Sequence, residues 1–107
     1  MKTESEKPVR VIFRKWPKKK GAKIFGEVIA LFPGIAATVG NPYHCQSYQT
    51  IGQHGAASVD LVRETKPAKP AEYADLKTEL ERIGYKLTIA HRFTAADLAA
   101  RKEQLSQ

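Results

Sequence analysis

The segment HCQSYQTIGQHGAAS, residues 44–58, holds the side chains best suited to chemistry. His44, Cys45 and His54 are of the types that ligate metals or form a nucleophile–base pair. A structural zinc site needs four ligands at compatible spacing, and these three together with His91 do not form such a pattern. The sequence also places no third group that would orient a Cys–His pair. We therefore predict no catalytic site, no metal and no cofactor.

Hairpin pairing of residues 45–51 with residues 57–63 decides which of these side chains share a face. A two-residue turn at residues 53–54 would place Tyr48 opposite Val59 and mix polar with apolar groups. A three-residue loop over 53–55, with Gly55 left-handed in a bulge, separates the two kinds of side chain and is favoured here. Cys45 then points into the core as a small buried hydrophobe.

The opposite face of this hairpin is polar and aromatic. It presents the predicted recognition surface, which consists of His44, Gln46, Tyr48, Gln53 and His54. A tyrosine ring among amide and hydroxyl donors suits base stacking or peptide binding. The alternative is that Tyr48 packs beneath residues 33–43 and that the glutamines merely face solvent.

The net charge of +7 is concentrated at the start of the chain. Residues 1–23 hold nine basic and two acidic residues, whereas the remaining residues hold nine of each. Clustered cations gain most from displacing counterions on phosphate, so this asymmetry indicates a polyanionic partner, DNA or RNA. The predicted nucleic-acid contacts are Arg10, Arg14, Lys15, Lys18, Lys19 and Lys20. The alternative is a solvated basic segment that aids solubility, and Trp16 beside it either stacks on a base or closes the core.

Alternating and continuous apolar patterns predict five strands, at residues 9–16, 24–32, 45–51, 57–63 and 85–93. Pro33 is expected to end the second strand and to start a loop over 33–43, which either covers a ligand or is inert. An amphipathic helix over 70–83 begins at Pro70 and stops at a left-handed Gly84. The fold class predicted is α+β, mainly an antiparallel sheet in the order β-β-β-β-α-β-α, with the helix packed on one face and the other face open.

At 107 residues the chain has room for one core and little surplus from which to build a deep pocket. We expect a disordered lead-in over 1–8 and a single domain over 9–93. Over 94–107 we expect either a helix capped by Thr94 that docks a partner or, as the favoured alternative, a frayed tail. The N-terminus shows no signal peptide, the longest apolar run is too short to cross a bilayer, and the only cysteine excludes an internal disulfide. These features predict a cytoplasmic protein without membrane contact.

Three segments resemble a known group of proteins. ALFP (30–33), CQSYQTIGQHGAAS (45–58) and TKPAKPAEYADLKTELERIGYKL (65–87) are similar to a family of small uncharacterised bacterial proteins associated with phages and other mobile elements. The resemblance covers roughly residues 9–92 and implies a bacterial or phage setting and an accessory role. It carries no activity, ligand or catalytic residue over to this chain.

Three functions follow from these residues. The first and predicted one is a non-enzymatic nucleic-acid-binding module. The second is a protein-interaction module, a regulator or inhibitor of a host protein that binds through the hairpin face. The third, a small metal-dependent or Cys/His hydrolase, would need His44 and His54 at a common cleft.

Overall fold

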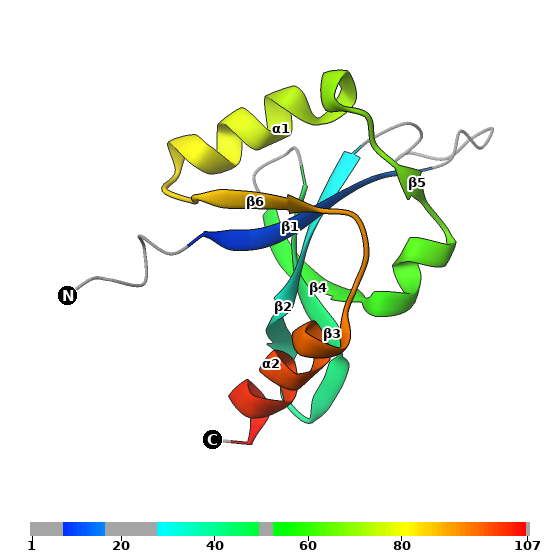
Figure 1. The fold of residues 1–107 in the computed structure, drawn as a ribbon, viewed down its shortest axis with the longest axis vertical. Helices are drawn as coiled ribbons and strands as arrows, with labels where there is room; N and C mark the ends of the chain where they lie inside the picture. Colours follow the sequence, from blue (N-terminus) through cyan, green and yellow to red (C-terminus); the bar gives the residue numbers. More distant parts are fainter. Residues whose placement is uncertain (1–7, 17–27, 50–52, 107) are drawn as a thin grey trace.

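A six-stranded sheet forms the centre of the computed structural model, which describes residues 8–16, 28–49 and 53–106 (Figure 1). The strands are β1 (Val9–Lys15), β2 (Val28–Thr38), β3 (Asn41–Gln49), β4 (Gln53–Ser58), β5 (Lys66–Pro67) and β6 (Leu87–Ala90). The helices are the 3-10 helix η2 (Val59–Arg63), α1 (Pro70–Arg82) and α2 (Ala95–Leu105). The predicted α+β class with a mainly antiparallel sheet is confirmed. None of the helices in the described part of the chain is long and apolar enough to cross a membrane.

Strand β1 lies inside the sheet, and two different strands share one of its edges. The sheet order is β4-β3-β2-β1-β5, with antiparallel pairing throughout this series. Strand β6 pairs in parallel with the first half of β1, from Val9 to Ile12, whereas β5 pairs with its last two residues. The parallel pairing was not predicted. The expected strand over 85–93 is shorter in the structure because only Leu87–Ala90 lie beside β1.

Helix α1 forms as its sequence pattern predicts and covers one face of the sheet, here called the α1 face. Leu76 and Leu80 are buried against a core that comprises Val11, Phe13, Val28, Ala30, Phe32 and Tyr48. Pro70 opens the helix, where a missing N–H costs no hydrogen bond. Gly84 has φ +116°, so the predicted left-handed stop is confirmed.

The second face of the sheet, here called the α2 face, is also covered, which corrects the prediction of an open face. Its buried core comprises Ile12, Ile29, Leu31, Cys45, Ala57 and Ala90, with Trp16, Leu61, Val62 and Phe93 packed against it. Residues 59–63 were predicted to extend a strand, but they turn into η2 after Ser58, whose side chain accepts a hydrogen bond from the Asp60 N–H. This turn places Leu61 and Val62 over the sheet. Trp16 accordingly packs against this core, the second of its two predicted roles.

Strand β2 continues through Pro33, contrary to the prediction that Pro33 ends it. Phe32 pairs with Gln46 and Ala36 pairs with Cys45, so three residues of β2 are inserted between adjacent partners on β3. Proline is tolerated in such a bulge because no ladder hydrogen bond is required there. The predicted loop over 33–43 is therefore two paired strand segments. Gly40, at φ +80°, lies in the turn between them.

Helix α2 satisfies the backbone groups that the bulge releases. Arg101 donates hydrogen bonds to the carbonyl oxygens of Pro33 and Pro42. Gln104 donates to the Gly34 carbonyl at 2.7 Å and accepts from the Ala36 N–H at 2.7 Å. Thr94 and Asp97 form the N-terminal capping box, so residues 95–105 are a docked helix and not a frayed tail. The helix docks mainly through polar side chains, which an apolar pattern does not reveal.

The β3–β4 hairpin has neither of the two registers considered from the sequence. Cys45 pairs with Ala57 and Gln49 pairs with Gln53, so the connection consists of residues 50–52, outside the described residues. Gly55 belongs to β4 and does not have a positive φ, which corrects its prediction as a left-handed bulge residue. The observed register differs from the favoured one by an even number of residues. Cys45 and Ala57 therefore share a face, as predicted, and Cys45 is fully buried.

Replacing Arg101 with methionine tests whether α2 docking depends on its hydrogen bonds. Arg101 is 3% exposed, and its loss would leave the carbonyls of Pro33 and Pro42 without these donors. An unpaired buried polar group costs about 1–3 kcal/mol, so we expect Arg101→Met to lower the free energy of unfolding in urea by about 2 kcal/mol or more. Lys102→Met, at the exposed neighbouring position, is the matched control and should change it little. Equal losses in the two variants would contradict this assignment.

Candidate functional site

Arg10, a predicted nucleic-acid contact, is held by an internal ion pair. Its Nε and Nη2 atoms donate to the two carboxylate oxygens of Asp97, each at 2.9 Å, and Nη2 also donates to the Arg92 carbonyl at 3.0 Å. Asp97 is 3% exposed and belongs to the α2 capping box. A two-pronged arginine–carboxylate contact fixes geometry as well as charge. These contacts of Arg10 attach α2 to β1.

Arg14 and Lys15, two further predicted contacts, also have internal partners. Arg14 donates to the carbonyl oxygens of Val62 and Thr65 and, at 2.9 Å, to the Thr65 hydroxyl. It therefore holds the turn between η2 and β5. Lys15 forms an ion pair with Glu72 in the first turn of α1. The remaining predicted contacts, Lys18, Lys19 and Lys20, lie outside the described residues.

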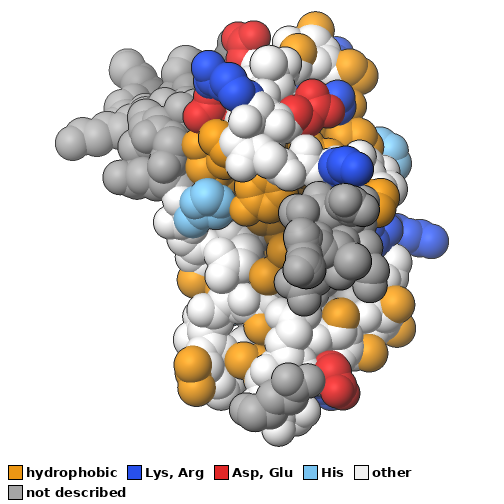
Figure 2. Space-filling model, turned by 90° about the vertical axis from the view of Figure 1, so that its left-hand side faces the viewer, with side chains coloured by type: hydrophobic (Ala, Val, Ile, Leu, Met, Phe, Trp, Pro, Cys, Tyr) orange, Lys and Arg blue, Asp and Glu red, His pale blue; other side chains and the backbone are white. Residues whose placement is uncertain are grey.

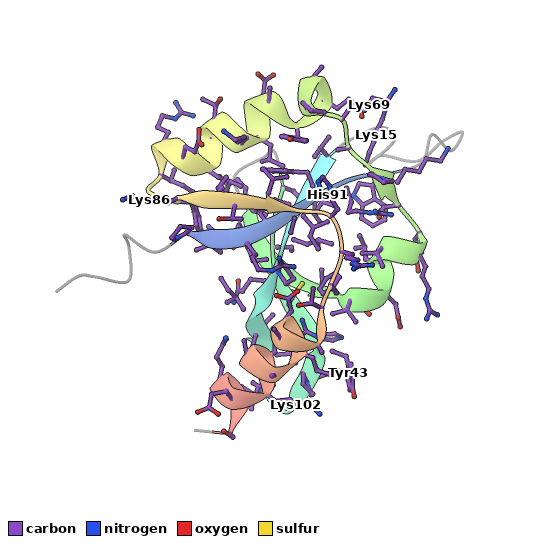
Figure 3. All side chains as sticks on the ribbon, viewed as in Figure 1. Lys15, Tyr43, Lys69, Lys86, His91 and Lys102 are labelled. Atoms are coloured by element: carbon purple, nitrogen blue, oxygen red, sulfur yellow. The ribbon has the colours of Figure 1, made fainter. Side chains whose placement is uncertain are left out.

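A group of cations that the sequence analysis did not select lies next to Lys15. Lys66 of β5 is the direct partner of Lys15 across the strand pair, and Lys69 precedes α1. Glu72 joins this group because one carboxylate oxygen accepts from the Lys69 N–H at 2.8 Å and the other binds Lys15. Figure 3 shows Lys15 and Lys69 at the end of β1, where β5 leads into α1. We call Lys15, Arg63, Lys66 and Lys69 the basic end.

Glu72 is the acidic member of this environment. The Lys15 ammonium and the Lys69 N–H stabilise its charged form and hold the pKa of the carboxyl below its ordinary value of 4.5. Lys66, Lys69 and Arg63 are exposed, and none has a carboxylate within ion-pair distance among the residues that the structure describes. The signal that could have revealed Lys66 and Lys69 is the lysine–proline alternation of TKPAKP, residues 65–70.

Tyr48 does not belong to an exposed recognition surface. It is 3% exposed and lies beneath α1, where its hydroxyl donates to a Glu79 carboxylate oxygen at 3.1 Å. Burial and the Glu79 contact raise its pKa above the ordinary value of 10.0. Of the predicted recognition residues, His44, Gln46, Tyr48 and His54 share a face, but Gln53 pairs with Gln49 at a register position of the other face. Helix α1 covers the Tyr48 end of the shared face. Tyr48 therefore offers no ring surface for stacking on a base.

His54 is the exposed member of an aromatic cluster at the rim of α1. Its ring meets Tyr48 edge-on with 4.7 Å between centroids, and its Nε2 lies 3.0 Å from the Tyr85 hydroxyl. Tyr85 in turn stacks on Phe32 at 5.1 Å. These contacts seat β4 against the segment that follows α1. Gln53, the neighbouring predicted recognition residue, lies in β4, and its side chain is outside the described residues.

His44 and Gln46 lie farther along the α1 face, beyond the helix. The His44 ring contacts the Thr38 hydroxyl at 2.9 Å and the Asn41 amide, and Gln46 contacts the Ala36 carbonyl at 3.4 Å. His44 pairs with Ser58 and His54 pairs with Tyr48, which separates the two histidines by four strand residues, about 13 Å. Figure 2 shows the charged side chains gathered mainly over α1, with hydrophobic and uncharged groups below it.

Cys45 lies in an environment that keeps its thiol protonated. Burial raises the pKa of its thiol to about 11, even though the nearby Arg101 charge lowers it. The protonated thiol is not a nucleophile at neutral pH. In the described ranges, no three histidine, cysteine, aspartate or glutamate side chains come close enough to hold a metal ion.

The chain matches no protein-family model, no curated protein and no solved structure. The resemblance to small phage-associated bacterial proteins therefore stays a prediction.

Acid should remove the contribution of the Arg10–Asp97 pair to stability. Burial opposes ionisation of Asp97, but hydrogen bonds from Arg10 and Thr94 outweigh it, and the net pKa lies below its ordinary value of 3.8. The stability that the ionised Asp97 carboxylate contributes is therefore complete above its unfolded-state pKa. It is lost as pH falls through the lower pKa that Asp97 has in the folded protein. We expect the stability gap between the wild type and Asp97→Asn to be constant near neutrality and to narrow only below about pH 4, measured by urea unfolding at several pH values.

Asp75→Asn, at an exposed position of α1, controls for the loss of one carboxylate. A stability gap for Asp97→Asn that does not change with acid would contradict the ion-pair assignment.

Cys45 should be chemically silent in the folded protein. Its side chain is fully buried and its thiol pKa is raised to about 11. At pH 8 we expect a thiol reagent such as dithiobisnitrobenzoate to react only as fast as the protein opens, and to react at once after denaturation in guanidinium. Rapid labelling of the native protein would show that the thiol is accessible and would contradict this account.

Proposed function

We propose that this chain is a non-enzymatic nucleic-acid-binding protein that contacts phosphates through its basic end. The proposal keeps DNA or RNA as the partner inferred from charge but moves the described contacts from Arg10 and Arg14 to Lys66, Lys69 and Arg63. A cytoplasmic location and a bacterial or mobile-element setting belong to the same proposal.

The observation that carries the proposal is the pairing of Lys15 directly opposite Lys66. Side chains directly opposite in an antiparallel pair lie close together on one face, and like charges there are destabilising. Glu72 pairs with Lys15, but no carboxylate in the described part of the chain pairs with Lys66. A cost of this kind is offset when a polyanion binds, because phosphate neutralises the unpaired cation and counterions are released.

The positions of the chain around this pair support the same reading. Lys15 pairs with Val28 in β2 and with Lys66 in β5. The sequence between Lys15 and Val28, residues 16–27, is therefore joined to the sheet at the basic end. That segment carries Lys18, Lys19, Lys20 and Lys23 in the sequence. Arg63 and Lys69 flank β5 on either side. The described cations Lys15, Lys66 and Lys69 thus lie at the end of the sheet from which this lysine-rich segment of the sequence continues.

The roles of the two arginines follow from their partners. Arg10 is neutralised by Asp97, and the guanidinium of Arg14 is occupied by two carbonyls and a hydroxyl. A phosphate would have to compete with contacts that hold α2 and η2 in place. We therefore assign Arg10 and Arg14 to positioning of these helices rather than to phosphate binding.

Charge reversal at the basic end tests the proposal. We expect Lys66→Glu/Lys69→Glu to weaken binding to a random-sequence DNA or RNA duplex or single strand by about tenfold or more at low salt. It should also reduce the slope of log affinity against log salt by about 2, since two phosphate contacts are lost. Fluorescence anisotropy with labelled oligonucleotides measures both quantities.

Lys86→Glu/Lys102→Glu is the matched control, because it changes the net charge equally at positions away from the basic end (Figure 3). Equal weakening by both double variants would indicate a diffuse charge effect and would overturn the proposed interface. Absence of binding by the wild type would overturn the function itself. The triple variant Lys18→Glu/Lys19→Glu/Lys20→Glu should weaken binding at least as much as the first double variant, since it adds a larger charge change.

A further inference from the structure

We infer that the nucleic acid held at the basic end is single-stranded, and that one of its unpaired bases enters a hollow on the α2 face. The inference rests on the proposed function. It adds a site for the base to the phosphate contacts already described.

The hollow has a volume of about 350 Å³ and lies over the β3–β4 side of the sheet. Small side chains create the space, since Gly55 and Ala57 of β4 both line it and both belong to the α2 face. Sites for drug-sized molecules have volumes of about 300–1,000 Å³. The hollow is at the lower end of this range, which suits one base.

Trp16 gives the hollow an aromatic wall. It packs against the α2-face core, remains half-exposed and lines the hollow. Its indole Nε1 atom is buried, without a hydrogen-bond partner in the described part of the chain. Any part of the ring that a ligand can reach is therefore carbon. Such a surface stacks on any base, because every base has a π-face.

The rest of the lining is uncharged and partly polar. None of the described residues that line the hollow is a lysine, arginine, aspartate or glutamate. Gln49 contributes an amide that can both donate and accept hydrogen bonds, as the edges of bases do. Ser47 donates its hydroxyl proton to the Gly55 carbonyl at 3.0 Å, which leaves its oxygen as an acceptor. The hollow thus suits an uncharged base and not a phosphate.

The hollow and the basic end share two segments of the chain. Trp16 directly follows Lys15 at the end of β1. The 3-10 helix η2 places Leu61 at the hollow and Arg63, two residues later, in the basic end. A strand whose phosphates lie at the basic end therefore passes beside the hollow. Cations for the backbone next to an aromatic surface for the bases are the usual arrangement in proteins that bind single strands.

A duplex does not fit this arrangement. Its bases are paired and stacked on one another, and a base enters a protein pocket only after it has been extruded from the helix. A single strand avoids that cost. We therefore expect an advantage for the single strand of about tenfold, the size of one base–aromatic stack.

Gly55→Val closes the hollow without straining the strand. Gly55 has no positive φ, and an added Cβ would meet only the Ser47 hydroxyl, at an ordinary distance of 3.7 Å. The larger side chain would extend into the space. Thr88→Val is the matched control, because it places valine at an exposed position of β6, outside the described lining of the hollow.

The probes are a labelled single strand of about 12 nucleotides, its duplex, and a strand of equal length made of abasic tetrahydrofuran residues. The abasic strand carries the same phosphates without bases. Anisotropy at about 0.15 M salt gives the affinities, and DNA and RNA forms are compared. Trp16 is the only tryptophan, so intrinsic fluorescence reports on the hollow alone.

We expect the wild type to bind the intact strand about tenfold more tightly than the abasic strand or the duplex, with quenching of Trp16 at saturation. Gly55→Val should lower affinity for the intact strand to that for the abasic strand, with the salt dependence unchanged. Thr88→Val should leave both affinities within about twofold.

Equal affinity for the intact and abasic strands would overturn the inference, as would unchanged Trp16 fluorescence at saturation or equal effects of the two valine variants. So would failure of acrylamide to quench Trp16 in the free protein, since a ligand could not then reach the ring.

The charge reversal Lys66→Glu/Lys69→Glu separates this inference from the proposed function. It should reduce the salt dependence and weaken binding of the intact and abasic strands by the same factor. Binding by the wild type without a preference for intact strands would overturn the base site and leave the phosphate contacts in place. Absence of any binding would overturn both.

Discussion

Two buried charged side chains of α2, Asp97 and Arg101, hold together parts of the fold that the apolar cores do not reach. Arg101 supplies donors to carbonyls on β2 and β3, and Asp97 binds Arg10 on β1. Without these contacts the bulge after Phe32 would leave polar backbone groups inside the protein unpaired, which is costly. The continuation of β2 past Pro33 and the closure of the α2 face both depend on this helix. The same contacts give Arg10, whose side chain is 39% exposed, an internal carboxylate partner.

Local patterns in the sequence predicted the elements whose stability is local. The stripe of Leu76 and Leu80, with Pro70 and Gly84 at the ends, indicated α1 because each signal lies within the helix or next to it. The prediction that Pro33 ends β2 was wrong because the donor to the Pro33 carbonyl, Arg101, lies 68 positions later in the chain. The prediction that Gly55 is a left-handed turn residue was wrong because, when the pairing register is unknown, the sequence does not distinguish a glycine in a strand from one in a turn.

Of the basic end, only Lys15 was predicted from the sequence, and the hairpin residues were predicted without the helix that covers them. Alternation correctly grouped His44, Gln46 and Tyr48 on one face, yet it carries no information on which face α1 covers, and without the register it could not place Gln53 and His54. The cationic character of β1 was also evident, but the partners of Arg10, Arg14 and Lys15 lie 48 to 87 residues away. The role proposed for Lys66 depends on its position opposite Lys15. Long-range pairing, which the sequence does not show, therefore decides which cations remain unpaired.

The shared edge of β1 has a consequence for the order in which the protein can assemble. One edge of β1 is paired only by residues 66–67 and 87–90. The carbonyls of the β2 bulge receive their hydrogen bonds from residues 101 and 104. A chain emerging from the ribosome would thus carry β1–β4 with an unfilled edge and unpaired carbonyls until α2 had been synthesised. The native topology therefore cannot be complete until α2 has left the ribosome.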